Sequence, residues 1–166
     1  MTRSGSERAF LRYAIFTVPL ILGLGILSGR LSNSGYGNPW FDALVKPETM
    51  PPGWAFGAAW TVLYILLGLS LALILAAPRQ RGRQLALGLF LVQMLLNFSW
   101  SPIFFAMHEV RAALFVIVLM LALTIAIAFL FFKIDRRAGL LLLPYMGWLA
   151  FASHLNYRIL ELNPAA

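Results

Sequence analysis

The sequence predicts an all-α integral membrane protein folded as a five-transmembrane-helix bundle. Hydrophobic residues make up 61% of the chain and charged residues 11%, whereas soluble domains are typically about half apolar and a quarter charged. A bilayer core about 30 Å thick requires about 20 mostly apolar residues per helix. Five such runs occur, at about 10–29, 54–77, 85–107, 112–132 and 138–160. Because the runs are continuous and fill most of the 166 residues, we expect a single helical membrane domain rather than a barrel.

The basic residues are distributed unevenly between the two ends of this bundle. One end combines the N-terminus with the second and fourth connections and holds Arg3, Arg8, Arg12, Arg79, Arg81, Arg83, Lys133, Arg136 and Arg137. The opposite end holds Arg30, Lys46, Arg111 and Arg158. The positive-inside rule therefore places the N-terminus in the cytoplasm. The formal charge of +7 is explained by topology, so we expect a lipid bilayer and no nucleic acid as a partner. A bacterial cell membrane is the expected location, although the sequence does not distinguish it from an outer membrane.

The first apolar run contains Pro19 and the small-residue pair Gly25 and Gly29, which permits close helix packing. Its basic N-terminal flank also resembles that of a signal peptide. Removal of this run would leave four spans and would separate the first basic cluster from the others. We therefore expect the run to be retained as a membrane helix.

The long connection at 30–53 is rich in proline and aromatic residues. Its prolines are Pro39, Pro47, Pro51 and Pro52. Proline fixes its own φ and pushes the preceding residue toward extended geometry, so we expect a stiff, non-helical cover. This segment has two interpretations of equal weight. It is either a lid over a pocket or an interfacial loop anchored at the headgroups by Trp40, Phe41 and Trp54.

The third run carries a line of polar residues within the membrane. Gln93, Asn97 and Ser101 recur at every fourth position, with Trp100 and Phe104 beside them, so they lie on one helical face. Polar side chains in a bilayer indicate either hydrogen bonds between helices or a functional cavity. Both interpretations apply to this face.

Matching stripes occur on two other runs. They are Phe56, Trp60 and Tyr64 on the second run, and Trp148, Ala152 and Leu155 on the fifth. Such stripes often serve only in packing. Their coincidence with a polar line and a stiff cover favours a cavity enclosed by the second, third and fifth helices.

Several kinds of chemistry lack the residues that they require. The second, third and fourth runs contain no Asp, Glu, Lys or Arg, which disfavours ion-coupled pumping. Cysteine is absent from the chain, and the only histidines, His108 and His154, show no metal-ligand spacing. We expect both histidines to serve at helix ends or in packing, and we expect no metal site and no hydrolytic site.

At these residues the chain resembles the translocator protein (TspO/MBR) family, also called tryptophan-rich sensory proteins. The family's first loop and second helix resemble Trp40, Phe41, Asp42, Lys46, Pro47, Pro51, Pro52, Trp60 and Tyr64. Its third-helix motif resembles Gln93, Asn97, Trp100, Ser101, Phe104 and Phe105. Its fifth-helix motif resembles Pro144, Tyr145, Trp148, Ala150, Ala152, Leu155 and Asn156. The first and fourth helices match only in being apolar.

The resemblance implies a bundle that is often a homodimer, with a pocket under the first loop. Family members bind porphyrins, haem and related tetrapyrroles there, and some bind sterols or synthetic drugs. The implied role is in tetrapyrrole handling, stress response or signalling, with porphyrin or haem as ligand and no obligate cofactor. The expected ligand-binding residues are Phe41, Pro51, Phe56, Trp60, Tyr64, Asn97, Trp100, Ser101, Phe104, Trp148, Ala152 and Leu155.

Two other functions also follow from the resemblance. One is light-dependent porphyrin degradation, in which Trp60 and Trp148 would be the chemically active residues. The other is passive transport of porphyrins.

The chain departs from the family pattern at two places. Thr49 follows Glu48 at a loop position where relatives usually carry an aromatic residue, so we expect a different lid contact. Tyr157 is followed at once by Arg158, without the spacer that the proposed sterol motif requires.

Overall fold

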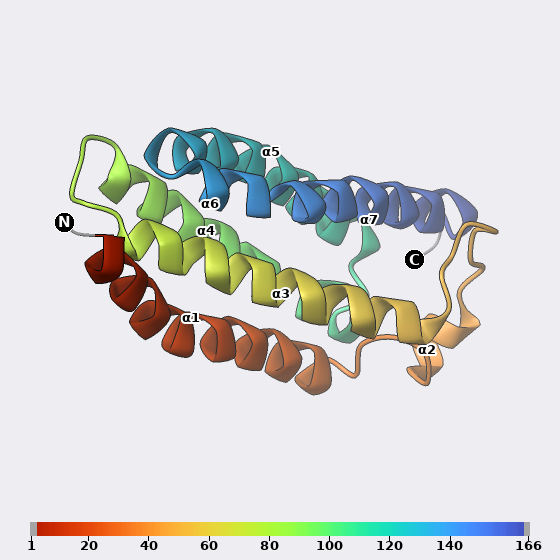
Figure 1. Ribbon diagram of the computed structural model, residues 1–166. Helices are drawn as coiled ribbons and strands as arrows, with labels where there is room; N and C mark the ends of the chain where they lie inside the picture. The colour runs from red at the N-terminus through yellow and green to blue at the C-terminus, as the bar shows by residue number, and fades with distance from the viewer. Residues whose placement is uncertain (1–2, 165–166) are drawn as a thin grey trace.

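Five membrane-spanning helices form the bundle in the computed structural model, which describes residues 3–164 (Figure 1). The elements are α1 Arg3–Leu31, α2 Pro39–Ala43, α3 Gly53–Ala76, α4 Arg83–Ser101, the π-helical turn η1 Pro102–Ala106, α5 Val110–Ile134, α6 Arg136–Leu141 and α7 Leu143–Leu162. The described residues contain no strand, which confirms the predicted fold class. The start of α1 and the end of α7 lie at opposite ends of the bundle (Figure 1), as an odd number of spans requires.

Close packing of α1 against α3 depends on two glycines. A Cβ atom at Gly68 would meet the backbone of Val18, and one at Gly25 would overlap the ring of Tyr64. Thr17 Oγ1 also donates a hydrogen bond to the carbonyl oxygen of Gly68 at 2.8 Å. Small residues let two helix backbones approach in a membrane, where the hydrophobic effect does not drive them together. The two helices therefore run side by side through the bilayer (Figure 1).

The third span, predicted at about 85–107, covers Arg83–Ala106, but its last turn is π-helical and not a regular α-helix. Proline 102 lacks an amide hydrogen and its ring clashes with the carbonyl four residues earlier, so the chain widens into the π-helical turn η1. The carbonyl of Phe98 loses its helical partner, and Ser28 Oγ donates a hydrogen bond to it at 2.6 Å. In the bilayer such a freed backbone group must be satisfied by protein. The turn buries both Phe104 and Phe105.

The fifth span, predicted at about 138–160, covers Arg136–Leu162 and contains one local break. It begins earlier, at α6, and breaks at Leu142 before α7 starts. Pro144 stands in the first turn of α7, where its missing amide hydrogen costs no helical bond. On α6, Gly139 lies so close to α5 that a Cβ atom would meet the backbone of Phe132. The break thus lets α6 pack tightly at one end while α7 runs on along α5.

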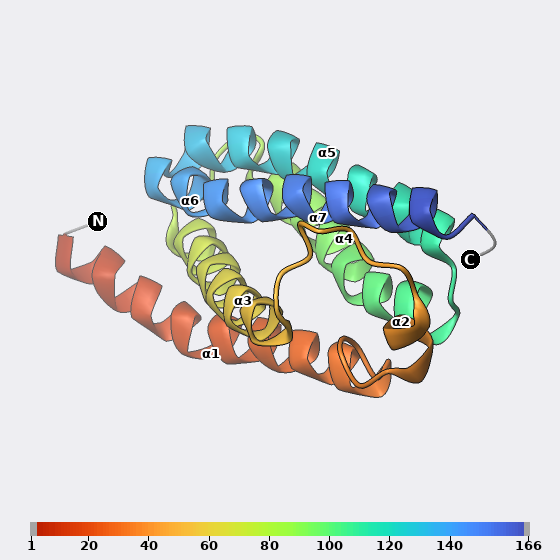
Figure 2. The same ribbon diagram turned by 90° about the vertical axis from the view of Figure 1, so that its right-hand side faces the viewer.

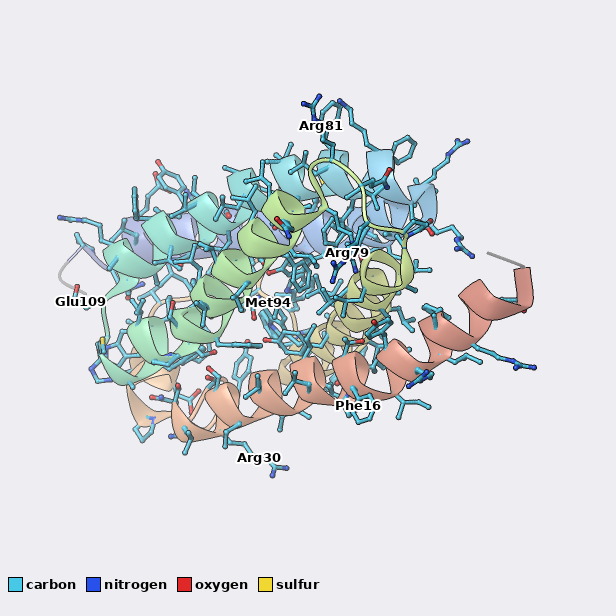
Figure 3. All side chains as sticks on the ribbon, turned by 90° about the vertical axis from the view of Figure 1, so that its left-hand side faces the viewer. Phe16, Arg30, Arg79, Arg81, Met94 and Glu109 are labelled. Atoms are coloured by element: carbon cyan, nitrogen blue, oxygen red, sulfur yellow. The ribbon has the colours of Figure 1, made fainter. Side chains whose placement is uncertain are left out.

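Arginine side chains lie at the basic end of the bundle, where one of them caps α3. Arg79 and Arg81 lie in the connection between α3 and α4, far from the lid end (Figure 3). Arg83 pairs with backbone carbonyl groups at the end of α3. Its Nε donates a hydrogen bond to Ile74 O at 2.9 Å, and its Nη2 donates one to Leu75 O at 2.8 Å.

The outer surface and the interior of the bundle differ as expected. Phe16 points away from the bundle, whereas Met94 lies among the helices (Figure 3).

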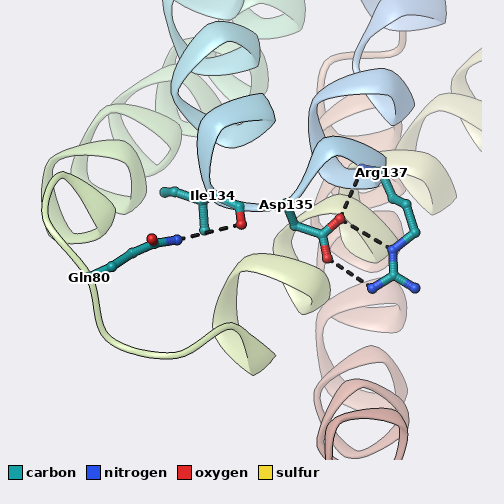
Figure 4. A network of polar contacts seen from close by, with 4 residues as sticks. All are labelled: Gln80, Ile134, Asp135 and Arg137. Carbon is teal, nitrogen blue, oxygen red and sulfur yellow. Dashed lines mark hydrogen bonds and ion pairs between the residues drawn. The ribbon is translucent and has the colours of Figure 1, made fainter. Parts of the chain in front are cut away.

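The turn before α6 is held by an aspartate cap. Asp135 Oδ1 accepts a hydrogen bond from the Arg137 amide at 2.9 Å, and Oδ2 pairs with Arg137 Nη2 at 2.9 Å (Figure 4). The hydrogen bond from Arg137 holds the pKa of the Asp135 carboxyl below its usual range. Gln80 Nε2 reaches Ile134 O at 3.5 Å from the neighbouring connection (Figure 4). The Gln80 contact links the two basic connections at one end of the bundle.

The predicted topology can be tested by labelling single cysteines, because the chain has none of its own. Glu48 and Arg81 are both exposed and lie at opposite ends of the bundle. We expect a membrane-impermeant maleimide to label Glu48→Cys in intact cells and to label Arg81→Cys only after the membrane is permeabilised. The reverse pattern would place the N-terminus outside the cytoplasm.

Candidate ligand cavity

A cavity of about 440 Å³ lies at the lid end of the bundle, between α1, α3, α4 and α7. The connection between α2 and α3 crosses this end of the molecule (Figure 2). The predicted residues that line the cavity are Phe41, Phe56, Trp60, Tyr64, Asn97, Trp100, Ser101, Phe104, Trp148, Ala152 and Leu155. Pro51 does not line it. The three stripes on α3, α4 and α7 therefore face one space.

Aromatic rings form the wall between α3 and α7. The centroids of Trp60 and Trp148 are 6.3 Å apart with the ring planes at 83°, and Phe56 meets Trp148 edge-on at 5.8 Å. One turn deeper, Tyr64 stacks on Trp60 at 5.2 Å. Edge and stacked contacts of this kind are preferred by aromatic quadrupoles. The wall thus presents ring faces in more than one orientation.

A buried hydrogen-bond network closes the deep end of the cavity. The hydroxyl of Tyr64 on α3 donates a hydrogen bond to Asn97 Oδ1 at 2.9 Å. Asn97 Nδ2 donates to the Tyr145 hydroxyl on α7 at 2.6 Å, and Gln93 Nε2 donates to the same oxygen at 2.5 Å. The network joins three helices. Both interpretations of the polar line therefore apply to Asn97, because its side chain forms hydrogen bonds between helices and also lines the cavity.

The lid contains a short helix, so the prediction of a wholly non-helical cover is wrong. Asn38 caps α2 by accepting hydrogen bonds from the amides of Trp40 and Phe41 at 3.0 and 3.2 Å. Pro39 occupies the first turn, where its fixed φ suits a helix. Lys46 Nζ then donates to three carbonyl oxygens at the helix end, including that of Phe41 at 2.7 Å. The asparagine before a proline was the sequence signal for this turn.

Two contacts attach the lid to the rest of the bundle, and one joins two parts of the lid itself. Asn163, at the end of α7, exchanges two hydrogen bonds of 2.9 Å with the backbone of Val45. Within the lid, the carbonyl of Pro51 accepts a hydrogen bond from the Tyr36 hydroxyl at 3.2 Å. Trp40 stacks on His108 with the ring centroids 4.3 Å apart.

Trp54 and Thr49, which the sequence marks as lid features, both lie outside the cavity lining but at different places. Trp54 is 76% exposed on the outer surface of α3, as an interfacial anchor would be. Thr49 is exposed and does not line the cavity, whereas its neighbour Met50 does.

The two histidines lie outside the cavity lining. His108 stacks on Trp40 of the lid and adopts a φ of 61°. His154 is exposed on α7.

Sequence reasoning missed the contribution of α1 to the lining. Leu22, Gly25, Ile26 and Gly29 face the cavity, although the first helix carries no aromatic or polar stripe. The spacing of Gly25 and Gly29 is the available signal, but taken alone it indicates only close helix packing. Tyr145 was also missed as the residue that receives the Gln93 and Asn97 amides.

The cavity lining is uncharged. None of the described residues that line it is Asp, Glu, Lys, Arg or His. Within residues 3–164 there is also no cluster of three or more His, Cys, Asp or Glu side chains that could hold a metal ion. The cavity can therefore offer aromatic faces and neutral hydrogen-bonding groups to a ligand.

Residues 16–162 match the model of the TspO/MBR family. The chain belongs to this family. It is 36% identical to tryptophan-rich protein TspO of Chlorobaculum tepidum over 90% of this chain and 98% of that protein. It is 37% identical to protein CrtK of Rhodobacter capsulatus over 75% of this chain and 79% of that protein. The translocator protein of Homo sapiens is 34% identical over 81% of this chain and 80% of its own length. The TspO/MBR match includes every residue that lines the cavity.

The network at the deep end predicts a specific loss of stability in this TspO/MBR protein. We expect Tyr145→Phe to lower the free energy of unfolding by about 1 to 2 kcal/mol, because the amides of Gln93 and Asn97 lose a partner in a buried site. Thermal unfolding in detergent measures the effect. Tyr13→Phe is the matched control, since Tyr13 is 41% exposed on α1. Equal unfolding temperatures for the two variants would contradict the role of the network.

Proposed function

We propose that this protein binds a tetrapyrrole, such as a porphyrin or haem, in the cavity beneath the lid. The observation that carries the proposal is the enclosed aromatic wall formed by Trp60 and Trp148. The volume of about 440 Å³ falls within the range of about 300 to 1,000 Å³ that is usual for small-molecule sites. Membership of the TspO/MBR family supports the same class of ligand.

The geometry favours a flat, largely apolar guest. Trp100 and Phe104 stack on each other with centroids 5.0 Å apart at 17°, and Trp100 Nε1 is fixed by the carbonyl of Ala113 at 3.1 Å. This second aromatic pair lines the cavity together with Trp60 and Trp148. A planar macrocycle would therefore bury its faces against rings from α3, α4, η1 and α7.

The biological role that we propose is in tetrapyrrole handling, stress response or signalling. A relative from Cereibacter sphaeroides, 36% identical over 75% of this chain, is called a tryptophan-rich sensory protein. The second, third and fourth apolar runs contain no Asp, Glu, Lys or Arg that could carry an ion across the membrane. A binding or sensing role therefore fits the chain better than driven transport.

Titration of the purified protein with protoporphyrin, followed by the Soret band, tests the proposal. We expect saturable binding that weakens at least tenfold in the triple variant Trp60→Phe, Trp148→Phe, Asn97→Ala. Because Asn97 also supports the fold, a second variant, Ala152→Trp, fills the cavity from a half-buried lining position and should abolish binding. Trp54→Phe, on the outer surface, should bind normally. Unchanged affinity in both cavity variants would refute the assigned site.

Photochemical degradation of the bound porphyrin is a second candidate function. The observation that favours it is that Trp60 and Trp148 are edge to face at 6.3 Å within the cavity wall. Either indole would lie against a bound macrocycle. If this function holds, illuminated protoporphyrin should decay at least several times faster with the protein than with detergent alone. The acceleration should be lost in Trp60→Phe, Trp148→Phe. Equal decay with and without protein would remove the catalytic interpretation.

A further inference from the structure

Two cations at the basic end of the bundle lie over aromatic rings that face outward. Lys133 Nζ is 4.1 Å from the ring centroid of Phe129, and the guanidinium carbon of Arg136 is 5.5 Å from the ring centroid of Phe132. The two rings are 60% and 44% exposed, and both cations are exposed as well. Because Phe129 and Phe132 are three positions apart on α5, they are neighbours on its surface. These four side chains form the outward-facing 129–136 patch.

The backbone beneath the 129–136 patch is fixed by the joint between α5 and α6. Gly139 packs so closely on α5 that a Cβ atom would lie 2.8 Å from the Cα atom of Phe132. The Asp135 carboxylate caps α6 by accepting a hydrogen bond from the Arg137 amide at 2.9 Å. Arg136 is the first residue of α6, so these contacts fix the point from which its side chain extends. The patch is therefore presented by a structured joint.

The cations of the patch are not neutralised within the protein. Among the described residues, neither Lys133 nor Arg136 forms an ion pair with a carboxylate. The acidic side chain between them, Asp135, pairs instead with Arg137, whose Nη2 is 2.9 Å from Oδ2. A ring face attracts a cation, but lysine and arginine each carry several N–H donors. The patch therefore retains positive charge and hydrogen-bond donors for an anion outside the chain.

An exposed apolar surface leads from the patch into the membrane. Ile125 is 51% exposed and lies one turn before Phe129, and Val118 is 49% exposed two turns before Ile125. All three belong to the span Val110–Ile134, whose mean hydropathy is 3.1. A soluble anion would match only the charges at the end of this surface. A phospholipid with an anionic headgroup matches both parts, because its acyl chains can lie along α5 while its phosphate meets the cations at the edge of the hydrocarbon.

We propose that the 129–136 patch and the adjoining face of α5 form a binding site for an anionic phospholipid. The phosphate accepts hydrogen bonds from Lys133 and Arg136, and the acyl chains pack on the exposed side chains of α5. Arg79 and Arg81 are also exposed at this end (Figure 3), but among the described residues they lie over no aromatic ring. The site lies beyond the proposed function and does not depend on what the cavity binds.

Native mass spectrometry of the protein in detergent tests this site by counting bound lipid. In an equal mixture of phosphatidylglycerol and phosphatidylcholine with the same chains, we expect the original chain to retain phosphatidylglycerol at least about fivefold more often. Lys133→Gln, Arg136→Gln should lose this preference. Arg79→Gln, Arg81→Gln removes the same charge from the same end and should keep it. Equal loss in the two double variants would overturn the proposal, because it would show a diffuse attraction to the basic end.

Two further arms separate the site from a folding defect and from a site for soluble anions. Lys133→Arg, Arg136→Lys conserves both charges and should keep the preference for phosphatidylglycerol, whereas its loss there would contradict the role of charge. Phosphatidylglycerol should raise the unfolding temperature of the original chain and of this variant, but not that of Lys133→Gln, Arg136→Gln. Glycerol phosphate, the soluble part of the headgroup, should not displace the lipid at equal concentration. Displacement would overturn the assignment to a lipid.

Discussion

The fold depends on one chain of hydrogen bonds in the membrane interior, which links Tyr64, Asn97, Tyr145 and Gln93 across three helices. Polar groups within a bilayer are costly to leave unpaired, because no water is available to them. Each of these four side chains is at most 8% exposed. The network fixes the spacing of α3, α4 and α7 at the level where the cavity ends. Above it the helices separate enough to leave a space lined by aromatic rings.

Interruptions of helical regularity shape the rest of the cavity. The π-helical turn at Pro102 brings Phe104 and Phe105 inward, and Ser28 satisfies the carbonyl that the proline leaves free. The break at Leu142 allows α6 to pack tightly at the basic end while α7 approaches the cavity. At the other end, the α2 cap and the Asn163 contact hold the lid in place. Glycine, proline and asparagine thus set the shape that the aromatic residues then line.

The sequence predicted the features that follow from helical periodicity. Apolar runs located the five spans, and the four-residue spacing of Phe56, Trp60 and Tyr64 identified the face that meets the cavity. Features that depend on neighbouring helices were not accessible in this way. The role of Tyr145 requires knowledge of which helix faces Asn97, and the contribution of α1 arises from its close approach at Gly25. The helix in the lid depends on the capping Asn38 before Pro39, whereas the prolines taken alone predict an extended segment.

The central claim is that a flat ligand lies against the inner wall of the bundle, and a panel of single-tryptophan variants tests it most directly. The five tryptophans are replaced by phenylalanine in all combinations that leave one in place, and each variant is titrated with protoporphyrin in nanodiscs. The structure predicts strong, saturable quenching of the fluorescence of Trp60, Trp148 and Trp100, which line the cavity, and weak quenching of Trp54, which faces outward. Equal quenching of Trp54 and Trp60 would contradict the account, because it would place the ligand in the surrounding lipid.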